Sequence, residues 1–276
     1  MRKSTVWTLV VVVLLGTAAF GAWRGYQAFT DRLVAERCYV TQGDGRFPLT
    51  HEQASNAAVI VAASFKAGLP ERAAVVALAT AWQESGLRNL DYGDRDSLGL
   101  FQQRPSYGWG TEAEIMDPWY SSARFYEELV KFDGWESVDI NDMAQKVQRS
   151  GHPEAYRKHE ANAVALASAL RGSSPGALTC FDRSEDAGNA DAFDAVIRVV
   201  PGVEITSAGN TVTLTSADKT SLWAATELAL AHTRAGGIQS AIVEDQAWEQ
   251  GPQGAWHTAK NPLPAGTAEL TLREVG

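Results

Sequence analysis

The feature that constrains this chain most is an apolar run that ends at a single carboxylate. Residues 73–82 are Ala, Val and Leu apart from Thr80 and the closing Trp82, and Glu84 follows two positions later. A helix that is apolar around its whole circumference belongs in a protein core. We therefore predict a buried helix with Glu84 on its last turn, at the wall of the core.

Two effects act on a carboxyl group in such a place. Burial disfavours the charged form of the group. The negative end of the helix dipole also disfavours an anion at a helix C-terminus. Glu84 is therefore expected to keep its proton near neutral pH, as a general acid must.

A second motif follows after a polar, glycine-punctuated turn. Glu84-Ser85, followed by Ser97-x-Gly-Leu-Phe-Gln102, resembles the Glu-Ser and Ser-x-Gly-Leu-Met-Gln signature of soluble lytic transglycosylases and goose-type lysozymes. Asp94 falls on the Asp of the goose-type Gly-Asp-Arg turn. The similarity extends over about residues 45–172 and implies an α-rich, lysozyme-like domain.

The resemblance also implies a reaction, the cleavage of the β-1,4 bond between N-acetylmuramic acid and N-acetylglucosamine in peptidoglycan. Glu84 would protonate the leaving oxygen and then act as base on the 6-hydroxyl of the sugar, which closes a 1,6-anhydro ring. This scheme needs one carboxylate, whereas most glycosidases use two. It implies no cofactor and no metal.

The remaining site residues are expected around Glu84. Ser85 and Ser97 would hydrogen-bond the site or the substrate, and Gln102 would hold a sugar substituent. Stacking on sugar faces is expected of Tyr107, Trp109 and Tyr120. The family's third motif, Ala-Tyr-Asn-Ala-Gly, is absent, and its polar role is expected of Gln148 or Tyr156.

Two alternatives stay open. A muramidase that uses water would need Asp94 or Asp96 to hold that water. The chain could instead be a non-catalytic cell-wall-binding or scaffold protein with a lysozyme-like cleft. The arginines of the turn, Arg88, Arg95 and Arg104, are expected to form surface ion pairs, with contact to substrate carboxylates as the alternative.

The N-terminus predicts export. Residues 6–23 carry no charge, and 18 helical residues span about 27 Å, close to the ~30 Å of a bilayer's hydrocarbon core. Arg2 and Lys3 precede the run, so we expect a single-pass anchor with the remainder outside the cell membrane. A cleaved signal peptide, which would give a secreted protein, is the alternative.

The two cysteines, Cys38 and Cys180, agree with an oxidising compartment. Exported proteins tend to pair their cysteines, so we predict a disulfide that ties the ends of the helical region. Two buried free thiols are the alternative. With no Cys-x-x-Cys and no neighbouring His, a metal site is not expected.

The formal net charge of −9 argues against nucleic acid and anionic lipid as partners of the exported part. The partners expected are glycan strands, with the membrane contacted through the N-terminal helix.

The whole chain is predicted to be α+β. Its parts are an anchor or signal peptide (1–23), a polar stalk (24–44), an α-rich lysozyme-like domain (45–180), a linker (181–193) and a small α+β domain (194–276). Capping boxes at Thr50–Gln53 and Thr111–Glu114 begin two of the helices. The other helices are expected at about 71–85, 118–132, 140–149, 154–171 and 218–233, and strands at 195–200, 211–215, 238–243, 255–258 and 268–272.

Overall fold

The computed structural model describes residues 17, 20–26, 29–30, 33–148, 154–252 and 254–274. The chain divides into two compact units, residues 1–35 and residues 36–276. In the first unit, residues 20–26 are helical. Most of the predicted anchor, residues 1–23, lies outside the described residues. Among those that are described, no helix has both the length and the apolar character needed to cross a membrane.

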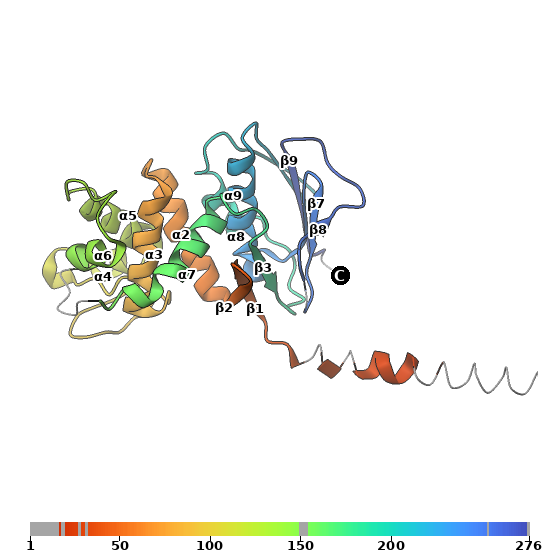
Figure 1. Cartoon of the computed structure of the whole chain (residues 1–276), viewed down its shortest axis with the longest axis horizontal. Coiled ribbons are helices and arrows are strands. Elements are labelled where there is room, and N and C mark those ends of the chain that lie inside the picture. Colours follow the sequence, from red (N-terminus) through yellow and green to blue (C-terminus); the bar gives the residue numbers. More distant parts are fainter. Residues whose placement is uncertain are drawn as a thin grey trace, which may run out of the picture. The chain divides into compact units, whose positions relative to one another are not determined.

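The second unit is α+β, as predicted, with two sheets (Figure 1). Its elements in chain order are β1 (Arg37–Gln42), β2 (Gly45–Leu49), α2 (His51–Lys66), α3 (Glu71–Ser85), η1 (Pro105–Tyr107), α4 (Glu112–Ile115), α5 (Pro118–Leu129), α6 (Ile140–Gln148), η2 (Arg157–His159), α7 (Glu160–Leu170), β3 (Leu178–Phe181), α8 (Asp191–Ile197), β4 (Glu204–Ala208), β5 (Thr211–Thr215), α9 (Lys219–Leu230), α10 (Thr233–Gly236), β6 (Ile238–Val243), β7 (Gln246–Glu249), β8 (His257–Thr258) and β9 (Thr267–Leu272).

Helix α3 is the centre of the helical part and packs against α2, α5, α6 and α7. Its residues 73–79 and 81 are buried, which confirms the predicted core helix. Both predicted capping boxes are present, at Thr50–Gln53 before α2 and at Thr111–Glu114 before α4. Each satisfies backbone N–H groups that the first helical turn leaves unpaired. Capping therefore fixes where these helices begin.

A six-stranded antiparallel sheet, in the order β4-β5-β9-β6-β7-β8, forms the other part of the unit. Helix α9 packs on β5, β6 and β9, and it also contacts α7 from the helical part. Gly172 shows how closely the two parts approach, because a Cβ atom there would lie 2.0 Å from the backbone oxygen of Thr220. The segment 182–190 has no helix or strand and lies within the predicted linker. The parts on either side of it nevertheless share one core.

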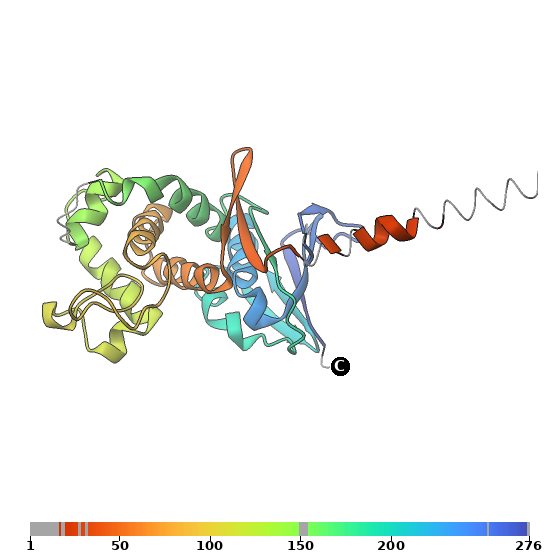
Figure 2. The same ribbon diagram turned by 90° about the horizontal axis from the view of Figure 1, so that it is seen from below.

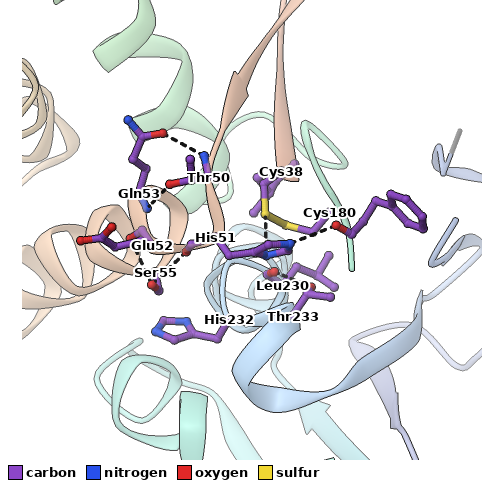
Figure 3. The surroundings of a disulfide bond; sticks show 12 residues. Cys38, Thr50, His51, Glu52, Gln53, Ser55, Cys180, Leu230, His232 and Thr233 are labelled. Atoms are coloured by element: carbon purple, nitrogen blue, oxygen red, sulfur yellow. Dashed lines mark hydrogen bonds between the residues drawn. A yellow bond between two sulfur atoms is a disulfide. The ribbon is translucent and has the colours of Figure 1, made fainter. Parts of the chain in front are cut away.

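A three-stranded sheet, in the order β2-β1-β3, joins the start of the unit to the segment after α7. In Figure 2 the β1–β2 hairpin (orange) extends outward from the unit. Cys38 and Cys180 lie opposite each other on β1 and β3 and form the predicted disulfide. Figure 3 shows the His51 ring beside this disulfide, with Nε2 3.0 Å from the carbonyl oxygen of Phe181. Burial lowers the pKa of His51.

Several predicted elements were wrong. Residues 195–200 were expected to be a strand, but helix α8 covers Asp191–Ile197 because Phe193, Val196 and Ile197 form an apolar stripe at helical spacing. The end of the predicted stalk, residues 24–44, contains strand β1, which begins at Arg37. Strands β1, β2, β3, β4 and β7 were not predicted.

The helix expected over 154–171 begins later than predicted. Glu154 has a positive φ of 67°, and the N–H groups of Tyr156 and Arg157 donate to the side-chain oxygen of Asn141. This connection precedes the short 3-10 helix η2, and α7 begins only at Glu160. As described below, the connection brings Tyr156 to the candidate site.

Candidate active site

Helix α3 places Glu84 at the surface of the core. The helix ends at Gly86, whose φ of 65° is left-handed and lets the chain turn away at once. Glu84 therefore lies in the last helical turn and is half-buried, as the sequence predicted.

One hydrogen-bond partner of Glu84 comes from a distant part of the chain. Tyr156 is completely buried, and its hydroxyl donates a hydrogen bond of 2.7 Å to Oε1 of Glu84. We expected Tyr156 to contact substrate. Because its ring is fully buried, Tyr156 instead contacts the carboxyl group of Glu84 from within the core. A buried donor of this kind fixes the orientation of a carboxyl group.

The second motif forms a compact loop opposite α3. Isolated bridges join Leu90 to Gly99 and Leu98 to Gln103. Two glycines allow this tight course. At Gly93 a Cβ atom would lie 1.9 Å from Oε1 of Gln102, and at Gly99, where φ is 75°, it would lie 2.7 Å from the carbonyl oxygen of Ile115. The Gly residues of this stretch are thus required by close approach.

A cavity of about 440 Å³ lies between α3, this loop and α6. The described residues that line it are Glu84, Asp94, Ser97, Gln102, Gln103, Arg104, Tyr107, Trp109, Val147 and Gln148. Glu84 is in this set with six of the side chains expected to contact the substrate, although they lie up to 64 positions apart in the sequence: Asp94, Ser97, Gln102, Tyr107, Trp109 and Gln148. The fold therefore brings both motifs and the end of α6 to one hollow.

Two amide side chains that line the cavity are held by backbone contacts. The Gln102 side-chain amide donates to the carbonyl oxygens of Tyr92 and Gly99, both at 3.3 Å. Gln148 donates to the carbonyl oxygen of Phe101 at 2.7 Å. Each amide thus has one end bound to the backbone, which fixes the position of the other end at the cavity.

Ser85 lies elsewhere than we expected. It is 4% exposed, and its hydroxyl donates to the carbonyl oxygens of Ala81 and Leu100 at 3.0 and 2.8 Å. It is not among the described residues that line the cavity. Ser85 therefore joins α3 to the second motif, which explains the Glu-Ser pair by packing rather than by substrate contact.

The two acids of the turn differ in their surroundings. Asp96 accepts hydrogen bonds from Nε of Arg104 (2.6 Å) and from the N–H of Ser106 (2.9 Å). Its bonds to Ser106 and Arg104 hold the pKa of Asp96 well below its ordinary value. Asp94 has a side chain that is 91% exposed, and its nearest cation is Arg95 at 4.0 Å. Of the two, only Asp94 faces the cavity.

The three aromatic residues expected to stack on sugar faces do not all lie at the cavity. Tyr107 and Trp109 line the cavity, and Tyr107 is 60% exposed. Tyr120 is not among the described lining residues, and its ring packs against Gly110 instead. The lining residues that the sequence did not single out are Gln103 and Val147. Gln103 donates from its amide to the carbonyl oxygen of Ser121, and its place next to Gln102 was the available signal.

No group of three or more His, Cys, Asp or Glu side chains in the described part of the chain could hold a metal ion. No family model matches the chain. No curated protein is significantly similar to it either.

Proposed function

We propose that this protein cleaves the glycan strands of peptidoglycan, as a lytic transglycosylase in which Glu84 is the general acid and base. The observation that carries the proposal is the position of Glu84, half-buried in the wall of a cavity of about 440 Å³, with a buried tyrosine hydroxyl 2.7 Å from its carboxyl group. A cavity with converging polar groups and a supported carboxyl suits a glycosidase.

In the proposed reaction Glu84 donates its proton to the glycosidic oxygen while the bond from this oxygen to C1 of N-acetylmuramic acid breaks. The carboxylate then removes the proton from the 6-hydroxyl of the same sugar, whose oxygen forms a bond to C1. The products are a 1,6-anhydro end and a free 4-hydroxyl, and no water is consumed. Ser97, Gln102 and Gln148 hold sugar substituents, and Tyr107 and Trp109 contact sugar faces.

The proposal includes a place for the reaction. The N-terminal segment anchors the chain in the cell membrane, and the remainder acts on the outside, where peptidoglycan is found. The disulfide between Cys38 and Cys180 supports an oxidising compartment.

Glu84→Gln tests the assignment because it preserves shape and removes the transferable proton. We expect the purified full chain to release soluble glycan fragments from sacculi, and the variant to do so at least about 100-fold more slowly. Glu136→Gln is the matched control, since Glu136 is exposed in the loop between α5 and α6. Equal release by wild type and Glu84→Gln would rule out the assignment.

Mass spectrometry of the released fragments distinguishes the transglycosylase from the two alternative functions. Anhydro ends support the transglycosylase. Reducing ends indicate a muramidase, a candidate favoured by the presence of Asp94 at the same cavity; in that case Asp94→Asn should also abolish release. Binding to sacculi without any release indicates a scaffold.

A further inference from the structure

Arg104 stands at a rigid point of the cavity wall. Just before it, Leu98 and Gln103 exchange two backbone hydrogen bonds of 2.9 and 3.0 Å. Just after it, Pro105 begins the 3-10 helix η1. The backbone on both sides of Arg104 is therefore fixed, and the direction of its side chain depends little on loop motion.

The guanidinium group is fixed as well. Its Nε donates to Oδ1 of Asp96 at 2.6 Å. Oδ2 of the same carboxylate accepts the N–H of Ser106. The ring of Tyr107 lies against the guanidinium group, with 4.3 Å between the ring centroid and Cζ. One edge and one face of the guanidinium group are thus occupied. The Arg104 side chain is 23% exposed. A planar fork held in this way loses little entropy when its outer edge binds a ligand.

The charges around the cavity limit which anion this edge can bind. Arg104 is the one cation among the described residues that line the cavity, and Glu84 and Asp94 line it too. These two acids disfavour a doubly charged ligand such as a phosphate monoester. The outer edge of a guanidinium group matches a carboxylate with two parallel hydrogen bonds.

We propose that Arg104 binds a carboxylate of the substrate beside Glu84, and that this contact makes the site selective for acidic over neutral glycans. The inference rests on the proposed function and adds the substrate group that the cavity selects. In peptidoglycan the carboxylate has two sources, the lactyl group of peptide-free N-acetylmuramic acid and the stem peptide.

Arg104→Lys is the test, because lysine keeps the charge and loses the planar fork. The full-length wild type and variant are assayed on peptide-free glycan strands, on the same strands with the lactyl carboxylate converted to a methylamide, on peptide-bearing strands, and on neutral chitin oligosaccharides. We expect KM to rise about tenfold for the strands that carry the bound carboxylate, and to change less than twofold for neutral substrates. A rise in KM on peptide-free strands identifies the lactyl group. A rise confined to peptide-bearing strands identifies the stem peptide.

Arg198→Lys is the matched control, because Nε of Arg198 also binds an aspartate, Asp194, on the surface of α8. It should leave all four substrates unchanged. If Arg104→Lys raises KM equally for all four substrates, the inference is overturned, because Arg104 would then only hold the loop in place. A wild type that cleaves methylamide strands as well as acidic ones would overturn it too, if Arg104→Lys also leaves KM unchanged on peptide-bearing strands.

Binding separates failure of this inference from failure of the proposed function. Glu84→Gln and Glu84→Gln/Arg104→Lys are titrated with a peptide-free tetrasaccharide containing N-acetylmuramic acid and with chitotetraose. Preference for the acidic sugar that disappears with Arg104→Lys supports the carboxylate site even if the wild type cleaves no glycan. Turnover that depends on Glu84, with neither such a preference nor a rise in KM on peptide-bearing strands in Arg104→Lys, supports the proposed function and refutes the inference.

Discussion

Two tyrosines of the helical part are buried down to their hydroxyl groups and differ in what those hydroxyls contact. Tyr126 donates to the carbonyl oxygen of Ile60 at 2.9 Å, within the packing of α5 on α2. Tyr156 donates to the Glu84 carboxyl at 2.7 Å. The first bond joins two helices, and the second orients a side chain at the cavity. The same chemical group therefore has a structural use at one position and a positioning use at the other.

Tyr156→Phe is expected to lower kcat for glycan cleavage about tenfold, the equivalent of about 1.4 kcal/mol in the barrier, while KM changes little. The hydroxyl orients Glu84 but lies outside the lining of the cavity, so binding of substrate should persist. Tyr126→Phe provides the comparison: its loss of a buried hydrogen bond should lower the melting temperature without a change in kcat. If both variants lower kcat equally, Tyr156 has no special relation to Glu84.

At the scale of elements, helix α9 carries a buried acid. Glu227 is completely buried, and its Oε1 accepts the N–H of Ala177 at 2.9 Å, just before β3. Its Oε2 has no hydrogen-bond partner among the described residues. Burial raises the pKa of Glu227 well above its ordinary value, and the bonds from backbone N–H groups only partly oppose this. The folded protein therefore keeps this carboxyl neutral to a higher pH than the unfolded chain does.

The sign of the pH effect follows from this shift. Below the ordinary pKa of a glutamate, both states are protonated and Glu227 contributes no pH dependence. Above it the unfolded chain ionises while the folded chain does not, so the free energy of unfolding falls as pH rises toward the folded pKa, by up to about 1.4 kcal/mol per pH unit. Glu227→Gln removes this loss. Urea titrations from pH 5 to 8 should show the variant gaining on the wild type as pH rises; parallel curves would contradict a neutral Glu227.

Local signals predicted elements better than long-range ones. Capping residues predicted where α2 and α4 begin, and the apolar run predicted α3, because each of these cues is contiguous in the sequence. The β1–β2 hairpin was missed although Gly43 and Asp44, at its turn, are a recognised two-residue signal. Helix α8 was mistaken for a strand because a short apolar run fits both periods.

The same distinction applies to the site. Most of its predicted residues came from one stretch, residues 81–104, in which spacing along the chain indicates which side chains lie together. The bond from Tyr156 to Glu84 spans 72 positions, and only the packed positions of α3 and the segment before α7 create it. No local pattern contains that information. The buried role of Ser85 was missed for the same reason, since it depends on contact with Leu100.

At the scale of the whole molecule, the disulfide joins two strands 142 residues apart in sequence. Between them lie all the helices of the helical part and every described residue of the cavity. Closing so long a loop in the unfolded chain removes much of its conformational entropy, so a bridge of this length stabilises a fold by roughly 2–5 kcal/mol. The bridge also fixes β1, the first strand of the compact unit, against β3.

Replacing both cysteines, in Cys38→Ala/Cys180→Ala, should lower the free energy of unfolding by roughly 2–5 kcal/mol. Reductant should lower the urea midpoint of the wild type toward that of the double variant, whose own midpoint it should leave unchanged. Because none of the described cavity residues belongs to β1, β2 or β3, kcat measured well below the unfolding transition should change less than twofold. Loss of activity in a variant that is still folded would mean that the three-stranded sheet also holds the cavity in shape. An unchanged midpoint would mean that packing alone holds β1 on β3.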